Sequence, residues 1–194
     1  MKKLVVLLMA MLIATSAFAI VDPDDNMMGI YFDLEADNPC IDGAAPYSTH
    51  EIYLVLTNMV ADAVYGFEAG YTIEGAGMVL STAFANPTPI DVGSAGNHIV
   101  GFGSPTMAGA NGVTLLATLT VMYMDTAMGP LNFDLHGTIP SSIDPMYPVI
   151  LLEGGVLLSV GLSAAEGPAA QFNGGCEVVA TDNVSFDGIK SLYR

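Results

Sequence analysis

The sequence predicts an all-β fold: an antiparallel, immunoglobulin-like or jelly-roll β-sandwich of about nine strands, preceded by a signal peptide. Apolar residues recur at every second position in a series of short segments, which is typical of strands with one buried face. Glycine, proline, asparagine and serine cluster between these segments and indicate turns. No long segment repeats its apolar residues with the helical period of about 3.6 residues.

The N-terminus has the three parts of a signal peptide. Lys2 and Lys3 precede an apolar run at residues 4–13, and small residues follow up to Ala19, after which we expect cleavage. The apolar run is too short to span a bilayer comfortably. No later segment offers about 18 uninterrupted apolar residues, so we expect no transmembrane segment after cleavage.

This division predicts three regions: residues 1–19 as the signal peptide, 20–180 as one β-sandwich domain and 181–194 as a C-terminal tail. The mature chain is long enough to bury a sizeable core in one domain. We expect the protein to be secreted or to lie in the cell envelope.

The first strand is predicted at Gly29–Glu35, with Tyr31 on its solvent-facing side. The most regular alternation follows between residues 50 and 73 and organises the predicted fold. In His50–Asn58 and again in Val64–Ile73, apolar side chains alternate with their neighbours. About five residues join the two patterns, so we expect these two strands to pair antiparallel with each other.

The most continuous apolar run of the mature chain, residues 112–124, carries apolar residues on both faces and is expected at the centre of the fold. Its threonines and valines favour a strand over a buried helix. Residues 85–97, rich in asparagine, proline, glycine and serine, are expected to form a long loop. The other predicted strands are residues 77–81, 98–102 and 131–135, and a hairpin made by 149–152 and 156–160.

The charge of the mature chain excludes several partners. It keeps two cations, Lys190 and Arg194, against 20 acidic residues, which leaves a formal net charge of −18. Binding to nucleic acid requires clustered cations, and so does binding to anionic membranes. We therefore expect no nucleic acid partner. A solvated acidic surface favours solubility.

The two cysteines, Cys40 and Cys176, are expected to form a disulfide. Export places them in an oxidising compartment, where an even number of cysteines favours bridging. The bridge predicts a separation of about 4.4–6.8 Å between their Cα atoms.

Two pairs of segments carry a resemblance to a known family. A strand at residues 54–58 ends in Asn58, and a short link leads to Tyr65-Gly-Phe-Glu68. Later, residues 116–121 are followed by the alternating segment 131–135. Over about residues 28–160, this arrangement resembles the cohesin-like and type 2 and type 3 carbohydrate-binding-module sandwiches. The resemblance implies extracellular binding to a protein or a polysaccharide, without catalysis.

No established catalytic motif is present. The serine in residues 93–96 lacks the spacing of a nucleophile elbow, and residues 101–105 lack the lysine of a phosphate-binding loop. The three histidines lack metal-binding spacing, and we expect structural or surface roles for them; they are His50, His98 and His136. We therefore expect no enzyme activity. A glycoside hydrolase whose carboxylates meet only in the fold is the less favoured alternative.

Calcium is the one cofactor that the acidic composition leaves open. The segment that begins at Asp22 resembles a calcium loop, but Met27 and Asp33 stand where an EF-hand has its glycine and its bidentate glutamate. An irregular calcium site between loops stays open, and the sequence assigns no residues to it.

A carbohydrate-binding face would need exposed aromatic rings, and the chain contains no tryptophan. Tyrosines are then the available stacking platforms, although tyrosines also fill cores. The candidate ligand platforms are Tyr31, Tyr65 and Tyr123, with Tyr47 and Tyr147 as further possibilities.

The C-terminal tail has its own candidate residues. It is expected either to be a frayed terminus or a strap packed on the domain, or to act as a recognition or sorting tail that docks on a secretion or envelope partner. Its candidate recognition residues are Phe186, Ile189, Lys190, Leu192, Tyr193 and Arg194.

The sequence therefore favours an exported, non-catalytic binding or structural module of cohesin-like type that contacts an extracellular or envelope protein. A carbohydrate-binding module with a polysaccharide ligand is the alternative.

Overall fold

The computed structural model describes residues 24–164 and 167–176. Within these ranges the chain forms strands and one short 3₁₀ turn, η1 (Glu153–Gly155). The strands are β1 (Met27–Tyr31), β2 (Cys40–Ile41), β3 (Thr49–Thr57), β4 (Ala63–Glu74), β5 (Gly77–Phe84), β6 (Pro89–Asp91), β7 (Asn97–Met107), β8 (Val113–Tyr123), β9 (Leu131–His136), β10 (Val149–Leu151), β11 (Leu157–Ser159), β12 (Gly161–Leu162) and β13 (Ala170–Phe172). The predicted signal peptide lies outside the described residues.

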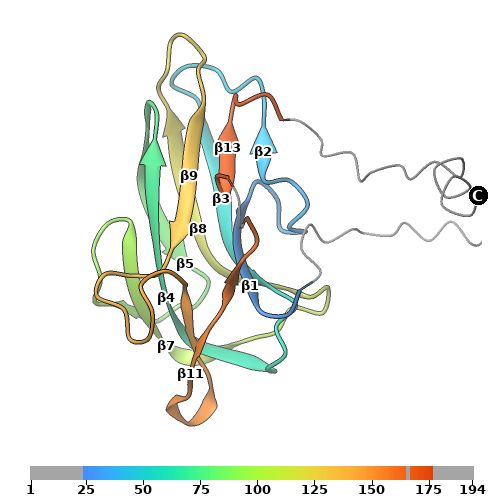
Figure 1. Cartoon of the computed structure of the whole chain (residues 1–194), viewed down its shortest axis with the longest axis vertical. Coiled ribbons are helices and arrows are strands. Elements are labelled where there is room, and N and C mark those ends of the chain that lie inside the picture. The colour runs from blue at the N-terminus through green and yellow to red at the C-terminus, as the bar shows by residue number, and fades with distance from the viewer. Residues whose placement is uncertain (1–23, 165–166, 177–194) are drawn as a thin grey trace, which may run out of the picture.

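The strands form two sheets that face each other, so the predicted β-sandwich is confirmed (Figure 1). One sheet has five strands in the order β12-β1-β3-β8-β5. The other has eight strands. In this sheet β4 pairs with β7 on one side, while β10 and β9 pair with successive parts of its other side. β6 extends the sheet beyond β7, β11 extends it beyond β10, and β13 and β2 extend it beyond β9. None of the described residues forms a helix of the length and apolarity that crossing a membrane requires.

Apolar side chains fill the space between the two sheets. β3 contributes Ile52, Leu54 and Leu56 to this core, and β4 contributes Phe67 and Ala69. β8 lies between β3 and β5, so the strand predicted at residues 112–124 is an interior strand of the five-stranded sheet, next to the terminal strand β5. From Ala117 to Tyr123 buried side chains alternate with half-buried ones, and a register shift at Leu116 in the ladder with β3 interrupts this alternation in the first half of β8.

The predicted pairing of the strands at residues 50–58 and 64–73 is wrong. β3 pairs with β1 and β8 in the five-stranded sheet, whereas β4 belongs to the eight-stranded sheet. The short link between them carries the chain from one sheet to the other. Residues of the link include Asn58, which adopts the left-handed conformation at φ 50°. Alternation identifies the face that a strand buries, but it does not identify the strand's neighbour.

The first strand is shorter than predicted. β1 ends at Tyr31 rather than at Glu35, because the chain then turns back on itself. The Asp33 side chain accepts a hydrogen bond from the Asp37 N–H at 3.0 Å and closes this turn. As a result Leu34, which a regular strand over Gly29–Glu35 would place on the buried face, is 46% exposed.

Short strands escaped prediction because two or three residues show no periodicity. β6 lies inside the predicted loop at 85–97, and β2, β12 and β13 were not predicted. β12 pairs parallel with β1, and β2 pairs parallel with β13. By contrast, the hairpin predicted at residues 149–160 is confirmed by the antiparallel pair of β10 and β11.

Candidate functional site

An apolar groove of about 360 Å³ lies on the outer face of the eight-stranded sheet. The residues that line it belong to β4, β6, β7, β10 and β11 or directly follow β6; they are Phe67, Glu68, Ile90, Val92, Ile99, Val100, Gly101, Val149, Leu151 and Leu157. Two of these side chains project strongly into solvent: Ile90 is 68% exposed and Val92 is 72% exposed. Exposed branched aliphatic side chains around a concave surface are typical of an interaction site.

Strand pairing and one glycine create this hollow. β6 pairs with β7 so that Ile90 lies opposite Gly101. A Cβ atom placed on Gly101 would meet no other atom within 4 Å, so a larger side chain at this position would project into the groove. The neighbouring residue Asp91 turns its carboxylate the other way, toward His98. Alternation along β6 therefore places Ile90 and Val92 on the same outer face.

Glu68 is buried on β4 beside the groove and is held by hydrogen bonds. The hydroxyl of Thr138 and the N–H of Ser142 donate to its Oε2 atom at 3.3 and 2.9 Å, and the hydroxyl of Ser142 donates to Oε1. These bonds fasten the β9–β10 loop, residues 137–148, to the sheet. Both carboxylate oxygens are engaged, so the contacts of Glu68 are structural rather than those of a free acid or base.

The pair of Asp91 and His98 fixes the edge of the groove. His98 Nδ1 lies 2.7 Å from Asp91 Oδ2, and the N–H groups of Gly93 and Ile99 donate to Asp91 Oδ1 at 2.9 and 3.1 Å. His98 is buried against the rings of Tyr71 and Phe84. The role expected for His98 was structural, and these contacts support it. Partial burial pushes the pKa of Asp91 upward, but the hydrogen bonds from His98, Gly93 and Ile99 outweigh it and hold that pKa below its ordinary value.

Asp91→Asn is therefore expected to lower stability at neutral pH and to lose this effect in acid. A carboxylate whose pKa is lowered by folding stabilises the protein above its unfolded pKa. That stabilisation disappears as the pH falls from 3.8 through the lower pKa of the folded state. Urea unfolding of both proteins between neutral pH and strong acid tests this. A difference in unfolding free energy that stays constant over the whole range would contradict it.

Two of the three predicted tyrosine platforms, Tyr31 and Tyr123, are buried, so the prediction is wrong for them. Tyr31 faces outward from β1, as predicted, but the turn after β1 folds Ala36 over it, so the ring is only 1% exposed. Tyr123 is fully buried in the core, where its hydroxyl donates to the Gly129 carbonyl oxygen at 2.6 Å. Neither ring can stack on an external ligand.

Tyr65 is half-buried and lines a second, smaller pocket of about 240 Å³. Asp62 and Glu153, both exposed, line the same pocket. Among Tyr31, Tyr65 and Tyr123, Tyr65 is therefore the one that still reaches an accessible surface. The two further tyrosines, Tyr47 and Tyr147, are exposed on separate loops outside both pockets.

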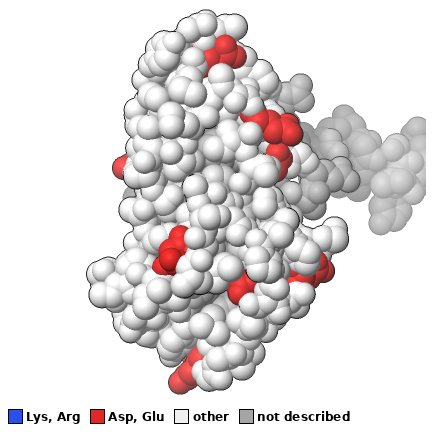
Figure 2. All heavy atoms as spheres, turned by 90° about the vertical axis from the view of Figure 1, so that its left-hand side faces the viewer, with Lys and Arg blue, Asp and Glu red and all other residues white. Residues whose placement is uncertain are grey.

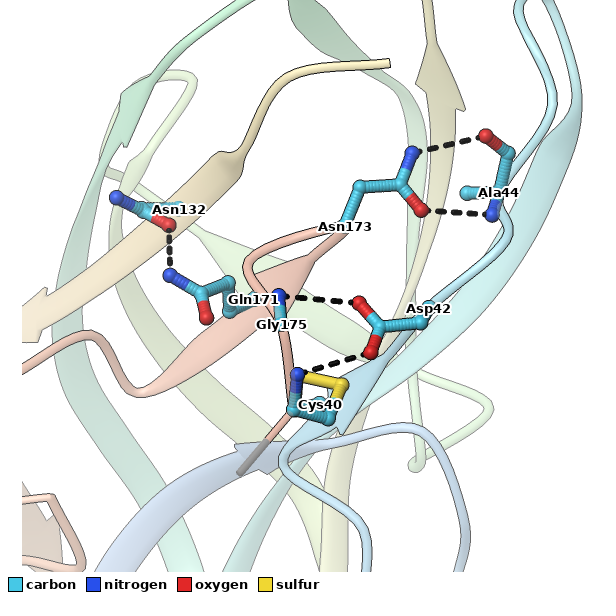
Figure 3. The surroundings of a disulfide bond; sticks show 8 residues. Cys40, Asp42, Ala44, Asn132, Gln171, Asn173 and Gly175 are labelled. Carbon is cyan, nitrogen blue, oxygen red and sulfur yellow. Dashed lines mark hydrogen bonds between the residues drawn. A yellow bond between two sulfur atoms is a disulfide. The ribbon is translucent and has the colours of Figure 1, made fainter. Parts of the chain in front are cut away.

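The predicted disulfide between Cys40 and Cys176 is confirmed, with a Cα–Cα distance of 5.6 Å. Hydrogen bonds surround it and form a clamp between residues 40–44 and 171–176 (Figure 3). The Asp42 carboxylate accepts from the N–H groups of Gly175 and Cys176 at 3.2 and 2.9 Å. The Asn173 side chain exchanges two hydrogen bonds of 2.9 Å with the backbone of Ala44.

The clamp also brings together three residues of metal-ligating type. Cys40, Asp42 and Cys176 form the one such group within the part of the chain that the structure describes. The two sulfur atoms are bonded to each other, and Asp42 caps the backbone, so these contacts explain the group without an ion. The calcium site that the sequence left open gains no residues from this group.

The proposed recognition residues of the tail, in residues 186–194, lie outside the described residues. The structure also reveals site residues that the sequence analysis missed, namely those of the groove. Ile90 and Val92 were assigned to a loop because proline and asparagine surround them. Their spacing of two residues was the available signal.

Comparisons with known proteins find similar chains among solved structures. No protein-family model matches the chain, and no curated protein does. Among solved structures, the chain is similar to a cohesin module of a family 33 glycoside hydrolase from Clostridium perfringens, with 10% identity, coverage of 70% of this chain and 91% of that one, and a TM-score of 0.46. A non-cellulosomal cohesin from Archaeoglobus fulgidus has 14% identity, covers 77% and 90%, and has a TM-score of 0.43.

A third similar structure is the sixth cohesin of scaffoldin B from Acetivibrio cellulolyticus, in complex with a Cel5 dockerin. Its identity is 11%, it covers 78% of this chain and 99% of that one, and its TM-score is 0.42. These structures are cohesin modules, the same kind of module that residues 54–58, 65–68, 116–121 and 131–135 resemble in sequence.

Proposed function

We propose that this chain is an exported, non-catalytic binding module of cohesin-like type that holds a partner protein in the apolar groove of its eight-stranded sheet. The observation that carries the proposal is the exposure of Ile90 and Val92 beside that groove. Burial of large aliphatic side chains against a partner is favourable, because it removes apolar surface from water. Strand pairing and hydrogen bonds fix the backbone that carries Ile90 and Val92. A surface fixed in advance loses little conformational entropy on binding.

The chemistry of the groove favours a protein over a sugar. Its exposed lining is aliphatic, whereas sugars stack on flat aromatic rings, and Phe67 is buried below the surface. A carbohydrate-binding module is the second candidate, because Tyr65 borders the smaller pocket together with Asp62 and Glu153. A glycan ligand would be expected there rather than in the groove.

Nothing in the contacts of the groove favours chemistry on a bound ligand. Glu68 is the carboxylate in its lining, and Thr138 and Ser142 occupy both of its oxygens. A glycoside hydrolase would need two carboxyl groups that flank the scissile bond, free to exchange protons with it. Binding is the function that this arrangement supports.

The location and the tail complete the proposal. We place the protein outside the cytoplasm, in the secreted fraction or the envelope, because the predicted signal peptide and the disulfide are both suited to an oxidising compartment. The tail at residues 181–194 then acts as a sorting or recognition segment. A chain that lacks residues 183–194 is compared with the full chain. If the truncated protein is mislocalised but has the same melting temperature, the result supports this role.

Ile90→Asp is expected to weaken partner binding by about tenfold or more, because a carboxylate buried in an apolar contact loses its hydration. The immobilised mature chain is exposed to envelope and medium proteins of the cells that make it, to a dockerin module and to a glycan array. The proteins retained by the wild type are then compared with those retained by the variant. Val60→Asp is the matched control, since Val60 is 69% exposed and lies outside the groove.

The pattern of loss decides between the candidates. If a protein retained by the wild type is lost with Ile90→Asp but not with Val60→Asp, the result supports binding in the groove. Equal retention by both variants contradicts it. Binding to glycans that is abolished by Tyr65→Ala would favour the carbohydrate-binding module instead.

A further inference from the structure

β5 ends the five-stranded sheet with one edge that pairs with no other strand of the described residues. The other strands that end a sheet are shorter: β12 and β2 have two residues each, and β6 and β11 have three. β5 has eight residues. An exposed edge of this length is open to pairing with another chain, and natural sheets commonly avoid such edges by keeping terminal strands short.

The sequence of β5 lacks charged blocking residues. Residues 75–90 contain no charged side chain, and β5 itself contains no proline. Met78 is 44% exposed and Leu80 is 49% exposed. A β-bulge at Leu80 interrupts the ladder with β8, and the regular stretch that remains beyond it is Ser81–Phe84. This stretch is therefore the part of the edge best suited to accept a strand.

The ladder with β8 determines which backbone groups of this stretch are free. The Ala85 N–H donates to the Leu116 carbonyl oxygen at 2.9 Å, so Ala85 faces β8. Antiparallel pairs alternate between residues that exchange hydrogen bonds and residues that do not. Ala83 and Ser81 therefore also face β8, whereas the N–H and carbonyl groups of Thr82 and Phe84 point to the open edge.

We propose that β5 is a dimerisation edge, on which two copies of this chain pair antiparallel about a two-fold axis at Ala83. Thr82 of each copy then exchanges hydrogen bonds with Phe84 of the other, and the two five-stranded sheets become continuous. Ala83 lies opposite Ala83 of the second copy, where the strands approach most closely and a methyl group fits. The interface is separate from the groove and does not depend on the proposed function.

The distribution of charge identifies a second copy as the partner. Between Gly75 and Met124, a segment that includes β5 to β8, the one acidic residue is Asp91. All four Lys and Arg residues of the chain lie outside the described residues, and Figure 2 shows a few acidic groups on a face that is otherwise neutral. Two copies repel each other through their acidic surfaces, so they associate where charge is absent. A cationic partner would gain more from the acidic surfaces than from β5.

The test measures mass in solution and cross-linking of the mature chain. In light scattering after size-exclusion chromatography, we expect the wild type to show twice the monomer mass, with a dimer fraction that rises as salt screens the repulsion. Ala83→Glu, which brings two carboxylates together at the axis, is expected to give the monomer. Val60→Glu adds the same charge at an exposed site in the link between β3 and β4 and is expected to leave the dimer intact.

Ala83→Cys provides an independent measurement. Directly opposed residues that do not exchange hydrogen bonds in an antiparallel pair have Cα atoms about 4.5 Å apart, which is within the range of a disulfide. With oxidised glutathione as oxidant we expect a covalent dimer on a non-reducing gel, and none from Val60→Cys. A wild type that stays monomeric in high salt, an Ala83→Glu variant that stays dimeric, or equal cross-linking of both cysteine variants would each overturn the proposal.

Discussion

Cys40→Ser is expected to lower the free energy of unfolding of the oxidised protein by about 4–5 kcal/mol. The bridge joins residues 136 positions apart, so it restricts the unfolded chain over nearly the whole domain. In the folded state the same ends are already held together, because Asp42 and Asn173 fasten residues 40–44 to residues 171–176. The loss therefore arises mainly from the unfolded chain rather than from broken native contacts.

Urea unfolding with and without a reductant measures this effect. Cys176→Ser and the double variant Cys40→Ser/Cys176→Ser should lose as much stability as Cys40→Ser alone, since each removes the same bridge. With reductant present, the wild type should become nearly as unstable as the variants. A wild type whose stability is unchanged by reduction, after its thiols are shown to be free, would contradict the entropic account.

The sequence predicted those features that depend on local alternation and chemistry. Strands such as β3, β8 and β9 were located because buried apolar side chains recur along much of each strand. The disulfide followed from an even cysteine count together with export. Neither argument requires knowledge of which segments meet in space.

Features that depend on long-range packing were not predictable. β3 and β4 follow each other in the sequence, but each pairs with strands far away in the chain. Tyr31 lies on the outer side of β1, where alternation predicts exposure, and the covering residue Ala36 belongs to a turn with no periodic signal. The groove depends on Gly101, whose importance becomes visible once Ile90 is placed opposite it. Alternation predicts which face of a single strand is buried, whereas a binding site is formed by residues from several strands.

The second large effect is expected for Phe172→Ala, with a loss of about 3–5 kcal/mol in the free energy of unfolding. Phe172 is fully buried on β13, a strand of three residues that the sequence did not reveal. Its ring packs edge-on against Phe32 at 4.7 Å between centroids, stacks on Tyr123 at 6.1 Å and contacts Phe133 at 6.2 Å. Truncation to alanine removes these contacts and leaves a cavity that the rigid strands around it fill only in part.

Phe84→Ala is the matched control for this variant. Phe84 is half-buried on β5 and contacts Phe67 and His98, so its truncation opens onto solvent and should cost clearly less than the truncation of Phe172. Both variants keep the disulfide, and urea unfolding under oxidising conditions compares them directly. If Phe172→Ala costs no more than Phe84→Ala, β13 does not complete the core. The clamp at residues 171–176 would then fasten the end of the chain without supporting the packing between the sheets.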